Sequence, residues 1–232
     1  MVRAGWLGLL LSLLALDVYA GSQREEPLSN SVKAMMQRSI SDRASPKLIF
    51  TTPQEGEAWL NEMSRRLQKR MPNAHNREDF LRTVHYEATR AGLDPQMVLG
   101  LIQVESGFKK YAVSSVGARG FMQVMPFWVR SIGAKDHNLF HLRINLRYGC
   151  TILRHYLDIE RGDLYRALGR YNGSLGKPQY PNMVLGAWRK NWTYTPPVFE
   201  APPKNLDNPP NVPIPPNVSS PSNISSRAAT AK

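Results

Sequence analysis

The chain has 232 residues, enough for one medium-sized domain with attachments and too few for two full domains. Hydrophobic residues make up 42% of it, which allows a packed core, and the net charge of +12 favours acidic partners such as nucleic acid, anionic lipid or anionic wall polymer. Cys150 is the only cysteine, so an intramolecular disulfide is excluded, and we expect no metal site.

Residues 1–20 have the pattern of a cleaved signal peptide. Arg3 supplies a positive start, an apolar run extends from Trp6 to Leu16, and Val18-Tyr19-Ala20 offers a small-x-small cleavage site. A membrane-spanning helix needs about 20 apolar residues, and this run is shorter. We therefore expect no transmembrane segment in the mature chain and a periplasmic or secreted location, where nucleic acid is not an available partner. An uncleaved N-terminal anchor is the alternative.

The next segment divides into a polar lead and the first helices. Residues 21–51 are polar and short of periodicity, which predicts a mobile lead segment. A capping box with proline at the first helical position, Thr52-Pro53-Gln54-Glu55, then predicts a helix that extends to about residue 70. A second helix is predicted over about residues 77–90, where Gly92 ends it.

The third predicted helix opens at Asp94-Pro95 and runs to Glu105. Its body is apolar nearly all round, and a helix with so little polar face is buried. After it, glycines, serines and other small residues predict a loop or a small hairpin near residues 108–123.

The remaining apolar patterns predict four more helices, over about residues 126–132, 144–159, 163–171 and 182–190. The helix predicted over about residues 144–159 contains Cys150 in its apolar stripe, which indicates that this cysteine packs in the core rather than acting as a nucleophile. Since no strand-length alternating run appears, the predicted fold class is all-α over residues 52–195. Ten of the 18 prolines lie in residues 196–232 among Asn and Ser, which predicts a disordered tail.

Glu105 is the odd residue of the apolar third helix, because it is charged and comes last. Desolvation and the negative end of the helix dipole both disfavour a charged carboxylate there. Its pKa is therefore expected to rise towards neutrality, as a general acid requires. A glutamate turned out to solvent at a fraying helix end is the alternative.

Glycosidic bond cleavage normally uses two carboxylates, yet the chain offers Glu105 no obvious partner. The next acidic residues occupy helix-flanking positions typical of solvated side chains: Asp136, Asp158, Glu160 and Asp163. One acid suffices if the substrate supplies its own nucleophile, because an internal hydroxyl is already held in place. The glutamate would protonate the leaving oxygen and then take the proton of the attacking hydroxyl.

Five short runs follow one another in order: Val104-Glu105-Ser106-Gly107-Phe108, Ala112-Val113-Ser114, Gly117-Ala118-Arg119-Gly120-Phe121-Met122-Gln123, Met125-Pro126 and Arg170-Tyr171-Asn172-Gly173-Ser174. Together they resemble the soluble lytic transglycosylase (SLT) family, over about residues 75–192. The resemblance implies a lysozyme-like all-α domain, related to goose-type lysozymes, that needs no cofactor or metal. It implies cleavage of the bond between N-acetylmuramic acid and N-acetylglucosamine in peptidoglycan glycan strands, with 1,6-anhydromuramic ends as product and the muramic C6 hydroxyl as nucleophile.

The resemblance also implies roles for single residues. Glu105 corresponds to the acid and base, and Ser106 next to it belongs to the substrate-binding set. Ser114 corresponds to a serine that contacts the muramic N-acetyl group or the glutamate. Gly120 and Gln123 correspond to a motif that walls the cleft and hydrogen-bonds sugar.

Four further positions complete the expected substrate-binding set. Met122 and Met125 would form the apolar floor of the cleft, with ordinary core packing as the alternative. Tyr171 corresponds to a tyrosine whose hydroxyl approaches the catalytic carboxylate, and Asn172 follows it in the motif. Tyr171 could instead be structural.

The chain departs from the family pattern at three places. Phe121 replaces the usual leucine, Lys109-Lys110 stands where Asn-Pro is common, and Arg170 replaces an alanine and places a large cation near the expected site. Two other functions fit the same fold: a hydrolytic muramidase that uses water, and a non-catalytic wall-binding module. The proline-rich tail suits a cell-wall or a secretion-machine partner, neither of which the sequence identifies.

Overall fold

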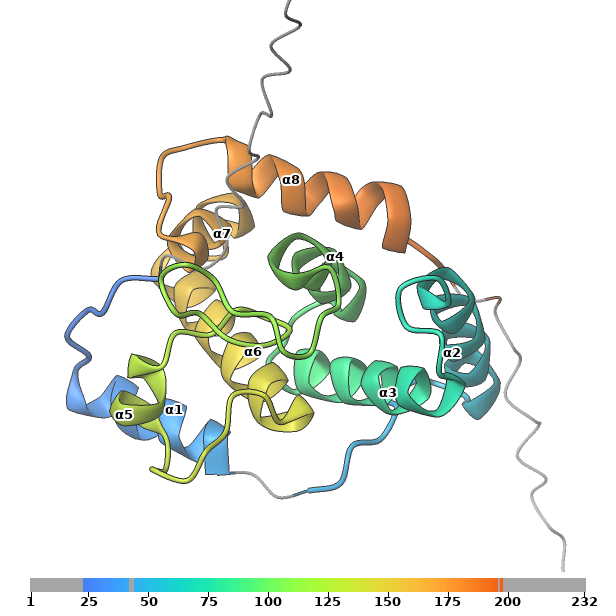
Figure 1. Ribbon diagram of the computed structural model, residues 1–232, viewed down its shortest axis with the longest axis horizontal. Coiled ribbons are helices and arrows are strands. Elements are labelled where there is room, and N and C mark those ends of the chain that lie inside the picture. Colours follow the sequence, from blue (N-terminus) through green and yellow to red (C-terminus); the bar gives the residue numbers. More distant parts are fainter. Residues whose placement is uncertain (1–22, 42–43, 196, 198–232) are drawn as a thin grey trace, which may run out of the picture. The chain divides into compact units, whose positions relative to one another are not determined.

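The computed structural model describes residues 23–41, 44–195 and 197, which are helical apart from connecting loops (Figure 1). The helices are α1 (Asn30–Ser41), α2 (Pro53–Leu67), α3 (Ala74–Arg90), α4 (Pro95–Ser106), α5 (Phe127–Ile132), α6 (Leu142–Ile159), α7 (Leu164–Asn172), α8 (Gln179–Ala187) and the π-helix η1 (Trp188–Trp192). The all-α prediction is confirmed for these residues. The predicted signal peptide lies outside them, as does the predicted tail apart from Pro197.

Local capping signals account for most helix starts. The Thr52 hydroxyl accepts a hydrogen bond from the Glu55 N–H at 3.2 Å, and Asp94 and Asp163 cap α4 and α7 in the same way. The predicted starts of these three helices are therefore confirmed. Three predicted boundaries lie three residues too far along the chain: α2 stops at Leu67 and α8 begins at Gln179, while α3 begins at Ala74, where Asn73 provides a cap that the prediction overlooked.

The prediction of a mobile lead over residues 21–51 is wrong for α1. Met36 and Ile40 of this helix are buried, Val32 packs against the same core, and the helix lies on α5 and α6. These three residues are spaced four apart and form a short apolar stripe, which the surrounding polar residues obscured. The folded region therefore begins well before Thr52.

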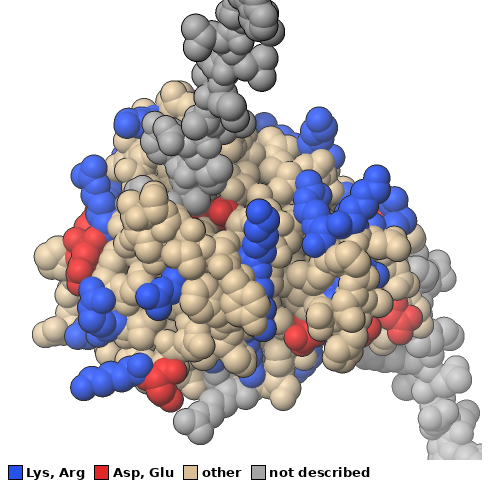
Figure 2. Space-filling view, viewed as in Figure 1, with Lys and Arg blue, Asp and Glu red and all other residues tan. Residues whose placement is uncertain are grey.

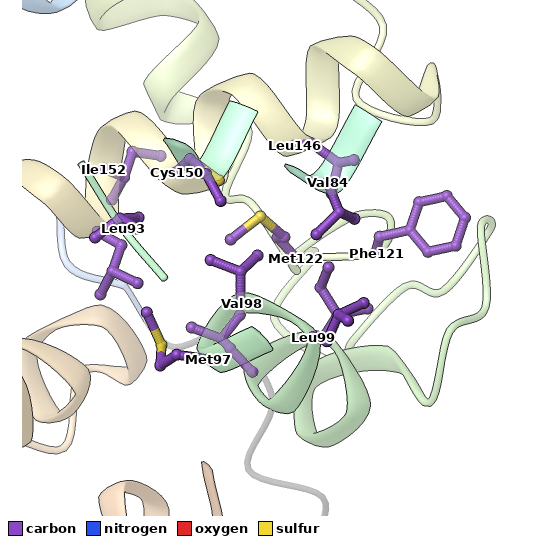
Figure 3. Packing of buried hydrophobic residues seen from close by; sticks show 14 of the residues in the cluster. Val84, Leu93, Met97, Val98, Leu99, Phe121, Met122, Leu146, Cys150 and Ile152 are labelled. Atoms are coloured by element: carbon purple, nitrogen blue, oxygen red, sulfur yellow. The ribbon is translucent and has the colours of Figure 1, made fainter. Parts of the chain in front are cut away.

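The apolar helix α4 lies in the middle of the fold, between α3 and α8 (Figure 1). It packs closely on η1 because Gly100 has no side chain: a Cβ there would lie 2.9 Å from the Trp188 backbone nitrogen. Met97, Val98 and Leu99 of α4 are buried in the same core cluster as Cys150 of α6 (Figure 3). Cys150 is fully buried, so its predicted packing role is confirmed.

A buried ion cluster joins α1, α3 and α6. Glu87 of α3 has no exposed surface and receives hydrogen bonds from Arg90 at 3.0 Å, Arg147 at 2.9 Å and Arg143 at 3.4 Å. Arg147 also donates to the Ile40 carbonyl of α1 at 3.1 Å. One carboxylate thus links three helices.

In the part of the chain that the structure describes, no helix combines the length and the apolar character that crossing a bilayer requires.

Candidate active site

Glu105 lies in the last turn of α4 and is 3% exposed. The helix stops directly after it because Gly107 takes a left-handed conformation, with φ of 57°. The Glu105 Oε1 atom accepts a hydrogen bond from the Tyr180 hydroxyl, whereas Oε2 is buried without a hydrogen-bond partner among the described residues. A carboxyl with one unsatisfied buried oxygen is suited to hold a proton.

Burial decides the protonation of this carboxyl. It raises the pKa of Glu105 from 4.5 to about 8, while the hydrogen bond from Tyr180 acts in the opposite direction. The predicted rise in the pKa is confirmed, and the alternative of a solvent-facing glutamate is wrong. At neutral pH the side chain can therefore donate a proton.

Tyr180 is the residue that sequence reasoning missed. It belongs to the first turn of α8, is buried, and lies 75 positions from its partner Glu105. Burial and the nearby Glu105 charge raise the pKa of Tyr180, so its hydroxyl keeps its proton and donates it to the hydrogen bond. The predicted start of the last helix, at about residue 182, left this tyrosine outside the helical pattern.

Tyr171 has a different role from the expected one. Its ring is fully buried, and its hydroxyl donates to the Met122 carbonyl at 2.7 Å rather than to Glu105. Burial is the main cause of its raised pKa, and the Glu105 charge also contributes. Tyr171 therefore fastens α7 to the loop beside the site, while Tyr180 contacts the carboxylate.

The loop between α4 and α5 has the expected irregular form. Two isolated antiparallel bridges, Val113 with Arg119 and Arg119 with Val124, are its only β-type pairings among the described residues. Gly120 has φ of 75°, and a Cβ there would lie 2.6 Å from the Leu139 carbonyl and closer still to Asn145. Glycine is required at this position by conformation and by space.

Gln123 closes this loop on itself. It is 1% exposed, has φ of 48°, and its amide nitrogen donates to the carbonyls of Gly120 at 2.9 Å and Ala112 at 3.2 Å. The two amide hydrogens are thereby engaged. In this conformation Gln123 shapes the loop rather than offering its N–H groups to a sugar.

The two methionines differ from one another. Met122 is fully buried among Val98, Leu146 and Cys150, as Figure 3 shows, and its N–H donates to the Asn145 side chain at 2.8 Å. The expectation that it forms a cleft floor is wrong, because the core encloses it. Met125 is half-buried and retains an accessible surface.

Three polar members of the expected set also make internal contacts. The Ser106 hydroxyl donates to the Phe121 carbonyl at 2.7 Å, and the half-buried Ser114 hydroxyl accepts from the Ala118 N–H at 3.1 Å. Asn172 donates to the Ser174 hydroxyl at 3.1 Å, whereas its buried Oδ1 atom has no partner among the described residues. Ser106 and Ser114 thus order the loop, and Asn172 keeps one free acceptor.

None of the other carboxylates in the described part of the chain acts on Glu105. Burial and Tyr180 account for its shifted pKa, with no contribution from another acid. The prediction of solvated acids is wrong for Glu160, whose side chain is 7% exposed and pairs with Arg166 and Arg170. Within the described ranges, no group of three or more His, Cys, Asp or Glu side chains could hold a metal ion.

Arg170, which the sequence placed near the expected site, is paired with acidic side chains. Its guanidinium pairs with Glu160 and lies 3.7 Å from Glu26, near the beginning of the described chain. Its charge is thereby balanced on the surface of α7.

The side chain of Gln23 also supports the site loop, which the sequence did not indicate. It is 4% exposed, and its Oε1 atom accepts from the Trp128 indole at 3.0 Å and from the Met125 N–H at 3.3 Å. Its amide nitrogen donates to the Gln123 carbonyl at 3.4 Å. A residue from before α1 is thus hydrogen-bonded to α5 and to the loop that precedes it.

Comparison with known proteins adds the following similarities. The family model described as transglycosylase SLT domain matches residues 82–181. A transglycosylase of Enterobacteria phage PRD1 is 34% identical over 110 residues, which cover 44% of this chain and 40% of the phage protein. Membrane-bound lytic murein transglycosylase C of Actinobacillus pleuropneumoniae serotype 5b (strain L20) is 47% identical over 47 residues, 20% of this chain and 13% of that protein. The chain thus spans less than half the length of these relatives.

Among solved structures, an inactive mutant of the lytic transglycosylase Slt from Pseudomonas aeruginosa is 25% identical. The match covers 53% of this chain and 22% of that chain, with a TM-score of 0.40.

Proposed function

Residues 82–181 are a transglycosylase SLT domain, and from this premise we propose that the chain is a lytic transglycosylase that acts on peptidoglycan glycan strands. The observation that carries the proposal is the buried Glu105, whose pKa of about 8 keeps it protonated at neutral pH and whose Oε1 atom is held by Tyr180. Such a carboxyl can act as an acid and, after it has lost its proton, as a base.

The proposed reaction cleaves the β-1,4 bond between N-acetylmuramic acid and N-acetylglucosamine. Glu105 gives its proton to the leaving glycosidic oxygen as the bond to muramic C1 breaks. The muramic C6 hydroxyl then bonds to C1 and returns its proton to Glu105, so that the enzyme is regenerated and no water is consumed. The internal hydroxyl replaces the second carboxylate, whose influence on Glu105 is absent among the described residues.

Tyr180 has a positioning role in this proposal. Its hydroxyl fixes one carboxylate oxygen and stabilises the charge that appears when Glu105 has given up its proton. The residues of the expected binding set that order the loop, above all Gly120 and Gln123, hold the wall beside the carboxylate. Met125, which is half-buried, is the proposed contact for substrate.

We further propose that the signal peptide over residues 1–20 exports the chain to the periplasm or the medium. That location gives it access to peptidoglycan, and the net charge of +12 favours binding to this anionic polymer.

The masses of the products test the reaction. Digestion of purified peptidoglycan should give fragments with 1,6-anhydromuramic ends, which are lighter by one water than hydrolysis products and lack a reducing end. Reducing muramic ends would instead identify a hydrolytic muramidase. Binding to peptidoglycan without any soluble product would identify a non-catalytic module.

The variant Glu105→Gln tests the assignment of the acid, with the exposed Glu78→Gln as a matched control. Clearing of sacculi should be lost in the first variant and unchanged in the second. Folding is not at risk: because the pKa of Glu105 rises from 4.5 to about 8 on folding, the carboxyl lowers the stability of the wild type as pH rises through this range. Glu105→Gln removes this destabilisation, so at pH 7 the thermal unfolding midpoint of the variant should be at least as high as that of the wild type.

A further inference from the structure

A cavity lies at the end of the α8–η1 segment. It has a volume of about 390 Å³ and is lined by Arg65, Arg66, Arg70, Lys190, Asn191, Trp192 and Thr193. Figure 2 shows Lys and Arg side chains gathered on this face, over α2 and the neighbouring end of α8. Four of the seven lining residues are cationic.

The charges in this cavity are only partly balanced. Glu62 accepts hydrogen bonds from Arg65 at 2.8 Å and from Arg66 at 2.6 Å, and the bond from Arg65 is the main reason why the pKa of Glu62 falls to about 2. Arg70 and Lys190 are exposed and have no acidic partner among the described residues. Four cations therefore face one carboxylate, and two of them remain available to an anion.

The walls of the cavity are held in place. Arg66 donates to the backbone carbonyls of Asn191 and Thr193, both at 3.0 Å, and joins α2 to η1. Trp192 is fully buried, and its indole donates to the Gln103 side chain of α4 at 2.9 Å. Two fixed walls with exposed cations between them resemble a preformed binding site more than a solvated surface.

The cavity lies within reach of the candidate active site. Tyr180, which holds Glu105, and Lys190 belong to one helical segment and are ten residues apart, or about 15 Å along its axis. The Arg70 guanidinium lies 5.8 Å from the centroid of the Phe108 ring, three residues after Glu105. Both sites therefore adjoin the same end of α4.

We propose that this cavity binds the carboxylates of the peptide stems that peptidoglycan carries on its muramic acid. The inference rests on the proposed function, since it takes the glycan strand to lie at Glu105. A stem of four residues reaches about 14 Å when extended, which matches the separation along the α8–η1 segment. Arginine and lysine are the side chains that bind carboxylates, through charge-assisted hydrogen bonds.

The double variant Arg70→Gln/Lys190→Gln tests this inference, with Lys69→Gln as a matched control. Lys69 is an exposed cation next to Arg70 but does not line the cavity. Each protein is assayed on glycan strands that carry stems and on strands from which an amidase has removed them. On stem-bearing strands the double variant should have a KM raised about tenfold and an unchanged kcat. On stripped strands it should equal the wild type, and Lys69→Gln should equal it on both.

Two results would overturn the inference: no change on stem-bearing strands, or the same loss on both substrates. A loss of binding to vesicles of anionic phospholipid, with stem-bearing strands still cleaved as by the wild type, would also overturn it and assign the cavity to a lipid surface. Failure of the proposed function is distinguishable, because the wild type would then cleave neither substrate or would release reducing muramic ends.

Discussion

Two opposing influences act on the carboxyl of Glu105. Burial favours its neutral form, whereas the Tyr180 hydroxyl favours the ionised form, and burial is the stronger of the two. The result is a pKa of about 8, close to the pH at which an acid that must later act as a base works best. We therefore expect the kcat/KM of the wild type to fall above about pH 8, where Glu105 loses its proton.

Replacing Tyr180 with phenylalanine should shift the alkaline limb of the pH profile, which is the fall of kcat/KM above about pH 8. Tyr180→Phe removes the donor that stabilises the carboxylate, so the pKa of Glu105 should rise further and the loss of kcat/KM should begin at higher pH. Activity at pH 7 should fall by about tenfold to a hundredfold, because the carboxyl is no longer oriented. The pH profile on soluble glycan fragments measures both effects, and a limb that stays in place or moves to lower pH contradicts the assigned contact.

Tyr171→Phe is the control for Tyr180→Phe, because it also removes one buried tyrosine hydroxyl. The hydroxyl that it removes donates to the buried Met122 carbonyl, so the variant should lose about 1–3 kcal/mol of stability to urea. Its alkaline limb should coincide with that of the wild type. The two tyrosines would thus separate into one that acts on Glu105 and one that fastens the neighbouring loop.

At the scale of elements, the loop between α4 and α5 depends on the contact of Gly120 with α6. Asn145 of that helix donates to the carbonyls of Arg119 and Leu139, both at 2.8 Å, and accepts from the Met122 N–H. A side chain at Gly120 would press on this asparagine and on the Leu139 carbonyl. The loop beside Glu105 is therefore ordered by α6.

Gly120→Ala should destabilise the fold by about 2–4 kcal/mol, since it adds a steric clash to an unfavourable backbone conformation. Gly117→Ala separates the two causes, because Gly117 also has a positive φ, of 87°, but no atom lies within 4 Å of its added Cβ. That variant should lose about 1 kcal/mol from strain alone. Equal losses in urea denaturation would show that the contact with Asn145 is unimportant.

Elements were predictable from the sequence where their signals are local. Thr52, Asp94 and Asp163 mark helix starts through bonds to residues two or three positions away, and Glu105 was recognisable from the apolar helix that contains it. The contact of Tyr180 with Glu105 spans 75 positions, and the docking of α1 depends on α5 and α6. The tyrosine contact leaves no periodic trace in a single sequence, and the apolar stripe of α1 is short and set among polar residues, so the partner of the acid and the start of the folded region were both missed.

At the scale of the whole molecule, Glu87 is the carboxylate that joins distant parts of the chain. Its arginine partners come from α3 and α6, and one of them reaches α1. Buried charges are tolerated only when they are paired, and a charge left alone by removal of its partner is costly.

Glu87→Gln should therefore cost about 3–5 kcal/mol, because it leaves arginines around a neutral side chain in the interior. Glu78→Gln, which removes an exposed pair with Arg82 on the same helix, should cost less than about 1 kcal/mol. Urea unfolding followed by circular dichroism measures the difference. Similar midpoints for the two variants would mean that the cluster contributes no more than a surface pair.

Gln23 lies three residues after Ala20, where the sequence predicts cleavage. Release of a leader after Ala20 would leave this glutamine as the third residue of the new chain, and its side chain would still reach the loop that carries Gln123. Proteolytic trimming by three residues more would take it away, and the N–H groups of Trp128 and Met125 would lose their acceptor. The place at which a processing peptidase stops would thereby determine how firmly the wall beside the carboxylate is tethered.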